Sequence, residues 1–132
     1  MAQILIVSEN DSDTGRLQTA LQDAGLTAEI TRSMAAGCEL ARSGRFGVMF
    51  CTPGLRGQSW RRLIETANRF DLSFEIVLFT RTFDLNEWGE ALHAGAFDVL
   101  DVLCDLPRAA DVAKRVLGMS LAKRSRPRFE QV

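Results

Sequence analysis

Residues that could do chemistry follow several short apolar stretches of this 132-residue chain. Cys51 ends one such stretch, Ser8 and Glu9 come directly after another, and Thr80 ends a third. A cysteine acts as a nucleophile or a redox centre when a nearby cation favours its thiolate. A carboxylate is a natural ligand for a hard divalent cation, and a hydroxyl can hydrogen-bond an anion. The position of these residues therefore suggests a site assembled from the ends of strands.

Other kinds of site are excluded by the residues that the sequence contains. Its three cysteines are far apart and show no C-x-x-C spacing, which argues against a disulfide framework or a zinc site. The single histidine, His93, lies in a helical pattern beside Gly95, where a polar residue near a helix end is routine. Neither a phosphate-binding glycine loop nor a Ser-His-Asp set is present. We therefore expect a protein that is not an enzyme.

Short apolar runs alternate with helical patterns along the chain. The runs predict five strands and each is followed by a helix, with serines or aspartate as caps for three of them, at Ser33, Ser59 and Asp84. Alternation of this kind predicts an α/β fold with a parallel sheet covered by helices on both faces. The most economical arrangement is a doubly wound five-stranded sheet of order 2-1-3-4-5. The predicted strands are residues 4–7, 27–31, 46–51, 74–80 and 97–100.

In such a sheet, ligands bind at the carboxyl ends of the strands. The topology brings together the residues that end, or directly follow, the first, third, fourth and fifth strands. These residues are Ser8, Glu9, Cys51, Thr80 and the pair 101–102.

At these positions the chain resembles a response-regulator receiver domain of two-component signalling. The resemblance covers about residues 3–119 and implies the (βα)5, flavodoxin-like receiver fold. It is strongest in Gly-Ala-Phe-Asp-Val-Leu at 95–100, which is similar to the stretch before the fifth-strand lysine of that family. The other stretches that carry it are Ile-Leu-Ile-Val-Ser-Glu-Asn at 4–10, Phe-Gly-Val-Met-Phe-Cys at 46–51 and Ile-Val-Leu-Phe-Thr at 76–80.

The resemblance also implies which residues should bind Mg²⁺ and accept a phosphoryl group, and most of them differ here. In that family an acidic pair and an acceptor aspartate hold the metal, a Thr or Ser ends the fourth strand, and a lysine ends the fifth. The aromatic switch position falls on Val99 and the proline after the lysine on Leu103. The acidic pair, the acceptor, the hydroxyl and the lysine fall on Ser8, Glu9, Cys51, Thr80 and Val102.

Acidic and basic members of the set are lost together, so the pocket can fold without a metal or an unpaired buried charge. We therefore expect a degenerate pseudo-receiver that needs no cofactor and no Mg²⁺. Three alternatives stay open: a phosphorelay receiver that still accepts a phosphoryl group, a redox sensor at Cys51, and a small flavodoxin-like ligand binder. Glu9 and Asp11 with ordered water could bind a divalent ion, and Arg56 or Arg81 could pair with Glu9 or favour a Cys51 thiolate.

A pseudo-receiver would act through a surface, binding a protein partner or a second copy of itself. In the family that surface is formed by the fourth helix, fifth strand and fifth helix. Trp88 is either an anchor of this surface or part of the core. The residues that we expect on it are Phe83, Leu85, Trp88, Val99, Lys114 and Arg115.

The C-terminal end of the chain is basic, whereas the chain as a whole carries a net charge of −1. We expect a receiver-like domain over residues 1–119 and a basic tail or linker over 120–132. A basic tail can bind nucleic acid, but no aromatic platform or recognition helix accompanies this one, so we expect no nucleic-acid binding. The sequence shows no transmembrane run and no signal peptide, which leads us to expect a cytoplasmic protein.

Overall fold

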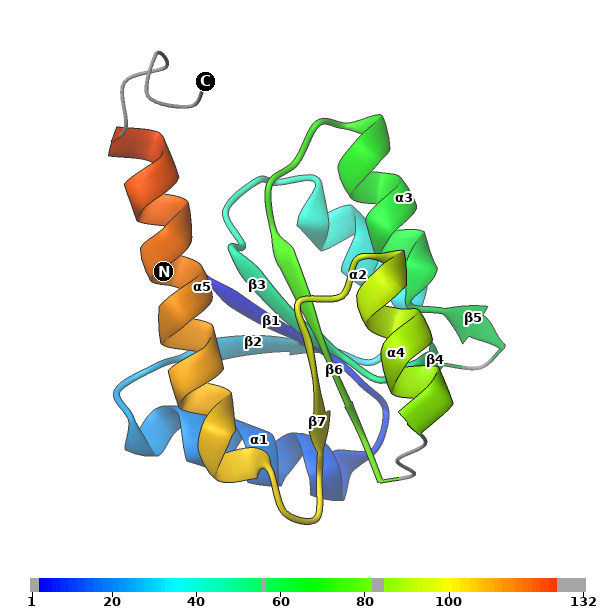
Figure 1. Ribbon diagram of the computed structural model, residues 1–132, viewed down its shortest axis with the longest axis vertical. Coiled ribbons are helices and arrows are strands. Elements are labelled where there is room, and N and C mark those ends of the chain that lie inside the picture. The colour runs from blue at the N-terminus through cyan, green and yellow to red at the C-terminus, as the bar shows by residue number, and fades with distance from the viewer. Residues whose placement is uncertain (1–2, 56, 82–84, 126–132) are drawn as a thin grey trace.

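A parallel five-stranded sheet forms the centre of the computed structural model, which describes residues 3–55, 57–81 and 85–125 (Figure 1). The strands are β1 (Ile4–Val7), β2 (Ala28–Thr31), β3 (Val48–Cys51), β6 (Glu75–Thr80) and β7 (Asp98–Asp101). Their order is β2-β1-β3-β6-β7. Since β6 and β7 are the fourth and fifth strands of this sheet along the chain, the predicted order 2-1-3-4-5 is confirmed.

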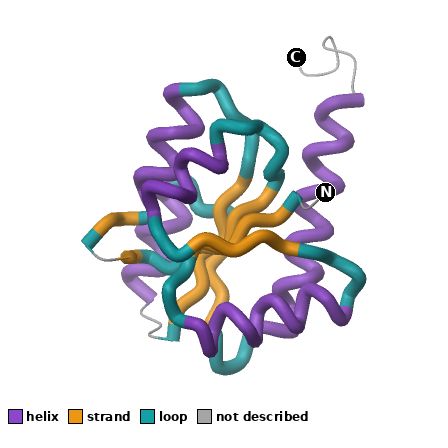
Figure 2. The backbone as a smooth tube through the Cα atoms, turned by 180° about the vertical axis from the view of Figure 1, so that it is seen from behind, coloured by secondary structure: helices purple, strands orange, loops and turns teal. Residues whose placement is uncertain are grey.

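Helices cover both faces of the sheet, as the alternating sequence pattern predicts. One face is covered by α1 (Asp11–Asp23) and α5 (Ala109–Ser125), the latter preceded by a 3-10 turn at Leu106–Arg108. The other face is covered by α2 (Met34–Ala41), α3 (Arg61–Arg69) and α4 (Leu85–Ala94). The two layers of helices lie on opposite sides of the sheet in Figures 1 and 2.

Strand residues alternate between two separate cores, and this explains why β1 and β3 are apolar throughout. In β1, Ile4 and Ile6 pack towards α1 and α5, whereas Leu5 and Val7 pack in the core beneath α2, α3 and α4. All four residues of β1 and of β3 are buried. A strand that is covered on both faces has no position at which a polar side chain would reach water.

Two of the expected helix caps can be compared with the structure. The Ser33 hydroxyl accepts the Ala36 N–H at 3.0 Å and caps α2 as predicted. The prediction that Ser59 caps α3 is wrong, because the N-cap is Trp60, which makes no capping hydrogen bond with its side chain. Ser59 lies one residue further back, in a strand, and its hydroxyl accepts the Arg61 N–H at 3.2 Å. Asp84 lies outside the described residues.

The connection between β3 and α3 is a small antiparallel hairpin, where the sequence suggests only a tight loop. It pairs β4 (Gly54–Leu55) with β5 (Gln58–Ser59), and Gly57 in its turn has φ +77°, a conformation that favours glycine. Strands of two residues are too short for an alternating pattern to reveal.

At the C-terminal end, α5 continues to Ser125, so the first six residues of the predicted tail are helical. Residues 126–132 lie outside the described part of the chain. Among the helices that the structure describes, none has both the length and the apolar character needed to span a membrane.

Candidate functional site

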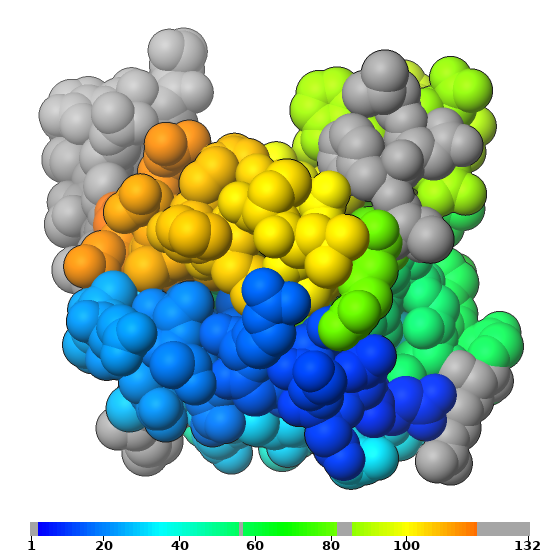
Figure 3. Space-filling model, turned by 90° about the horizontal axis from the view of Figure 1, so that it is seen from below, coloured from blue at the N-terminus to red at the C-terminus, as the bar shows by residue number. Residues whose placement is uncertain are grey.

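The sheet register aligns the carboxyl ends of the strands along one edge of the molecule. Val7 is paired with Cys51 between β1 and β3, and Thr80 with Asp101 between β6 and β7. The Val102 N–H continues this alignment by donating to the Thr80 carbonyl oxygen at 3.0 Å. In Figure 3, which views the molecule from below, the end of β6 (green) lies between α1 (blue) and the segment after β7 (yellow).

An open depression of about 420 Å³ lies over the ends of β1 and β3. Cys51 does not line it and has no exposed surface. Ser8 is also buried, and its hydroxyl accepts the Asn10 N–H at 3.2 Å. The residues that line the depression are Ser8, Glu9, Asn10, Thr52, Gly54 and Leu55.

Cys51 lies in the apolar core beneath this depression. Its thiol donates to the Thr52 carbonyl oxygen at 3.1 Å, and it packs in the same core as Val7 and Leu55. Burial, with a smaller contribution from Cys38, raises the pKa of the Cys51 thiol to about 12. The thiol is therefore neutral at physiological pH. Since the thiolate is the reactive form of cysteine, neither nucleophilic nor redox chemistry is favoured at this position.

The raised pKa of Cys51 predicts a specific loss of stability in alkali. An unfolded thiol ionises near its ordinary value of 9.0, whereas the folded thiol keeps its proton up to about pH 12. Between these values the folded state binds more protons, so the free energy of unfolding falls as the pH rises. At pH 10 we expect Cys51 to account for a loss of about 1–2 kcal/mol relative to pH 7.

Urea unfolding of the wild type and of Cys51→Ser at pH 7 and pH 10 measures this contribution. The serine variant keeps every other titrating group, so the difference between the two proteins isolates the thiol. We expect the wild type to lose more stability than the variant. Equal losses in both proteins would mean that the folded and unfolded thiols ionise alike.

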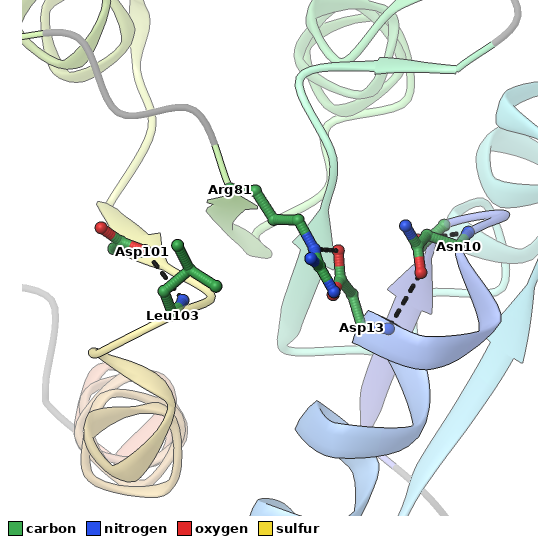
Figure 4. A network of polar contacts seen from close by, with 6 residues as sticks. Asn10, Asp13, Arg81, Asp101 and Leu103 are labelled. Atoms are coloured by element: carbon green, nitrogen blue, oxygen red, sulfur yellow. Dashed lines mark hydrogen bonds and ion pairs between the residues drawn. The ribbon is translucent and has the colours of Figure 1, made fainter.

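An ion pair between Asp13 and Arg81 crosses the strand ends. Asp13 lies in the first turn of α1 with only 7% of its side chain exposed, and Arg81 directly follows β6. The Arg81 guanidinium binds both carboxylate oxygens of Asp13. Its Nε lies 2.9 Å from Oδ1 and 3.1 Å from Oδ2, and its Nη2 lies 2.8 Å from Oδ1. This hydrogen bonding raises the pKa of Arg81. Figure 4 shows Arg81 reaching from the end of its strand across to α1.

The sequence predicts only one member of this pair. Arg81 is expected near the site, with Glu9 as a candidate partner, but nothing in the sequence singles out Asp13. Asp13 has the appearance of an ordinary acidic residue in a first helical turn, where its N–H donates to the capping Asn10 side chain at 3.0 Å. Arg56, the other expected cation, lies outside the described residues.

The residues at the strand ends do not fit Mg²⁺ well. Mg²⁺ needs several hard oxygen ligands in an octahedral array. Among the described residues that line the depression, Glu9 is the one carboxylate, while Asp13 is bound by Arg81 and the exposed Asp11 is paired with Arg32. Within the described ranges, no group of three His, Cys, Asp or Glu side chains could hold a metal ion.

The end of β7 offers no amine to this site. Val102, at the position that the resemblance assigns to a lysine, is fully buried in the core formed with α1 and α5. The turn after it is fixed by two carboxylates: Asp101 accepts the Leu103 N–H at 2.8 Å, and Asp105 accepts the Asp101 N–H at 3.0 Å. Asp101 therefore bonds within its own turn and lies apart from Arg81 in Figure 4.

The expected interaction surface is only partly exposed. Trp88 is 37% exposed on α4, and Lys114 and Arg115 are exposed on α5. Val99 has to be removed from this surface, because it is 6% exposed and packs in the core beneath α4. The side chain of Leu85 is not described, and Phe83 lies outside the described residues.

Comparison with known proteins gives the fold. No model of a known protein family matches the sequence, and no curated protein matches it. The signal receiver domain of an HD domain-containing protein from Pseudomonas fluorescens superposes with a TM-score of 0.79 at 20% identity, over 96% of this chain and 93% of that one. The chain has the receiver fold.

Two further structures agree with this receiver fold. A response regulator from Thermotoga maritima has a TM-score of 0.75 at 14% identity, covering 89% of this chain and 98% of its own. A two-component response regulator from Clostridium difficile has a TM-score of 0.73 at 19% identity, covering 89% and 96%. Identities this low establish the fold but leave the chemistry to be argued from the residues present.

Proposed function

We propose that this chain is a pseudo-receiver: a signalling domain that works without phosphorylation and acts by binding a protein partner or a second copy of itself. The observation that carries this proposal is the state of Cys51. It stands where the resemblance places the phosphoryl acceptor, yet it is a buried, neutral thiol with no exposed surface. Because no surface of Cys51 is exposed, a phosphoryl donor has no access to its side chain in this fold.

The Asp13–Arg81 pair supports the same proposal. The phosphoryl-transfer mechanism needs positive charge held close to the transferred group, which a metal and a lysine supply in the receiver family. Two of the described cations lie near these strand ends: the Arg81 guanidinium is already bound to both oxygens of a buried carboxylate, and Arg32 is paired with Asp11. Both cations therefore already have a carboxylate partner in the absence of a ligand.

The surface over α4 and α5 is our candidate for the interaction. Trp88 is a large apolar side chain that is partly exposed on α4, and Lys114 and Arg115 add positive charge on α5. Tryptophan and arginine are the residue types most enriched among the energetic centres of protein interfaces. This surface therefore has the composition of a docking site, and its use need not involve the strand ends.

Photo-crosslinking in the source cells tests this surface. A crosslinking amino acid at position 88 or 115 should capture a defined protein, or a second copy of the chain, whereas one at the exposed position 16 on α1 should not. Light scattering of the purified protein over a range of concentrations, with and without Mg²⁺ and a small phosphodonor, tests the independence from phosphorylation. Adducts at position 16 alone, or association that requires the phosphodonor, would contradict the proposal.

A further inference from the structure

A second cavity, of about 270 Å³, lies between α4 and the connection from β3 to α3. It shares no lining residue with the depression over β1 and β3. Leu78, Ala91 and Val99 supply buried apolar surface, and Thr80 and Ser59 add hydroxyls. The cavity lies near the carboxyl edge of the sheet, where open α/β sheets bind ligands, and its volume is close to the lower limit for small-molecule sites.

Both tryptophans of the chain line this cavity. Trp60 is buried with 4% exposed, and Trp88 is 37% exposed. The face of an indole is the aromatic surface that attracts cations most strongly. One cation already uses it, because the Arg61 guanidinium carbon lies 5.7 Å from the centre of the Trp60 ring. In the described part of the chain, no such cation stands over Trp88.

The charge around the cavity favours a positive ligand. Glu87 and Glu90 both line it from α4, where their spacing of three places them on one face of the helix. Arg61 is the one described basic residue in the lining. None of the ion pairs in the described ranges involves either glutamate. Two carboxylates beside an exposed indole are the groups that recognise an organic ammonium ion.

We propose that this cavity binds a small organic cation, with an ammonium group held by Glu87, Glu90 and the Trp88 ring and an apolar body held against Leu78, Ala91 and Val99. This inference does not depend on the proposed signalling function. It shares Trp88 with the candidate interaction surface, but it uses none of the residues that line the depression over β1 and β3. It holds equally whether or not Cys51 can be phosphorylated.

Nuclear magnetic resonance offers a direct test, because the chain has two indole N–H signals and both belong to the cavity. Titration with benzyltrimethylammonium should shift both signals to saturation. Benzyl alcohol and benzoate, which have a similar ring but no positive charge, should bind at least about fivefold more weakly. A titration in which the cation shows no saturable shift, or binds no better than benzyl alcohol, would overturn the proposal.

Matched variants test the role of the carboxylates. The double variant Glu87→Gln/Glu90→Gln keeps the shape of the cavity and removes its negative charge, so it should weaken binding of the cation about fivefold. Glu65→Gln removes an exposed carboxylate from α3 that does not line the cavity, and it should leave the affinity unchanged. Unchanged affinity in the double variant, or an equal loss in Glu65→Gln, would contradict the assignment.

Discussion

Cys51→Asp is expected to lower the free energy of unfolding by about 3 kcal/mol at pH 7, because it places a carboxylate where no side-chain surface is exposed. The new carboxyl would lie in the core with Val7 and Leu55. In the receiver family, an aspartate at this position is the working acceptor. Here, we expect the same residue to be a structural defect.

The pH dependence of this variant gives a second readout. Burial should raise the pKa of the introduced carboxyl above its unfolded value of about 4. A raised pKa means that the folded variant is relatively stable at low pH and loses stability as the pH rises through that pKa. Compared with Cys51→Ser, which keeps a donor towards the Thr52 carbonyl, Cys51→Asp should therefore lose stability between about pH 4 and pH 7.

Urea denaturation of both variants at the two pH values is the measurement. Intact mass after incubation with Mg²⁺ and acetyl phosphate shows whether the aspartate has become an acceptor. A Cys51→Asp protein as stable as the wild type, or one that gains a phosphoryl group, would show that the pocket is still built for phosphoryl transfer.

Arg81→Met should also destabilise the protein, and it should lower the free energy of unfolding by more than Asp13→Leu does. Removing the arginine leaves the buried Asp13 carboxylate without its cation, and a buried polar group stripped of its partner costs about 1–3 kcal/mol, or more when it is charged. Asp13→Leu removes the buried charge instead. It leaves Arg81, whose side chain is 49% exposed, free to turn towards water.

The double variant Asp13→Leu/Arg81→Met completes the comparison. It contains neither charge, so it should recover much of the stability that Arg81→Met loses. Denaturant unfolding of the two single variants and the double variant gives the coupling between the residues. If Arg81→Met and Asp13→Leu cost the same, or the double variant is the least stable of the three, the pair does not work as a neutralised buried charge.

The fold could be predicted from the sequence because its signals are local and repeated. Runs such as 4–7 and 76–79 are apolar throughout, as strands buried on both faces require, and a helical pattern follows each one. The features that the sequence did not predict are two short local ones. The hairpin of β4 and β5 has strands of two residues, and α3 begins beyond Ser59 because that residue belongs to the hairpin.

The candidate site was harder to predict because its main contact is distant in sequence. Cys51 could be placed at a strand end from its own apolar run, but the partner of Arg81 lies 68 residues away on another element. The burial of Val99 and the cavity between the two tryptophans likewise depend on how α4 packs over the sheet. Position along the chain does not reveal which side chains such packing covers.

We infer that the strand ends of this receiver fold no longer bind Mg²⁺ and a phosphoryl group. Amide spectra recorded with Mg²⁺ and beryllofluoride, a mimic of the phosphoryl group, test this most directly. We predict no saturable shift centred on residues 8–9, 51 and 80 and no gain in mass with acetyl phosphate. A stable change that is confined to those residues would contradict the account.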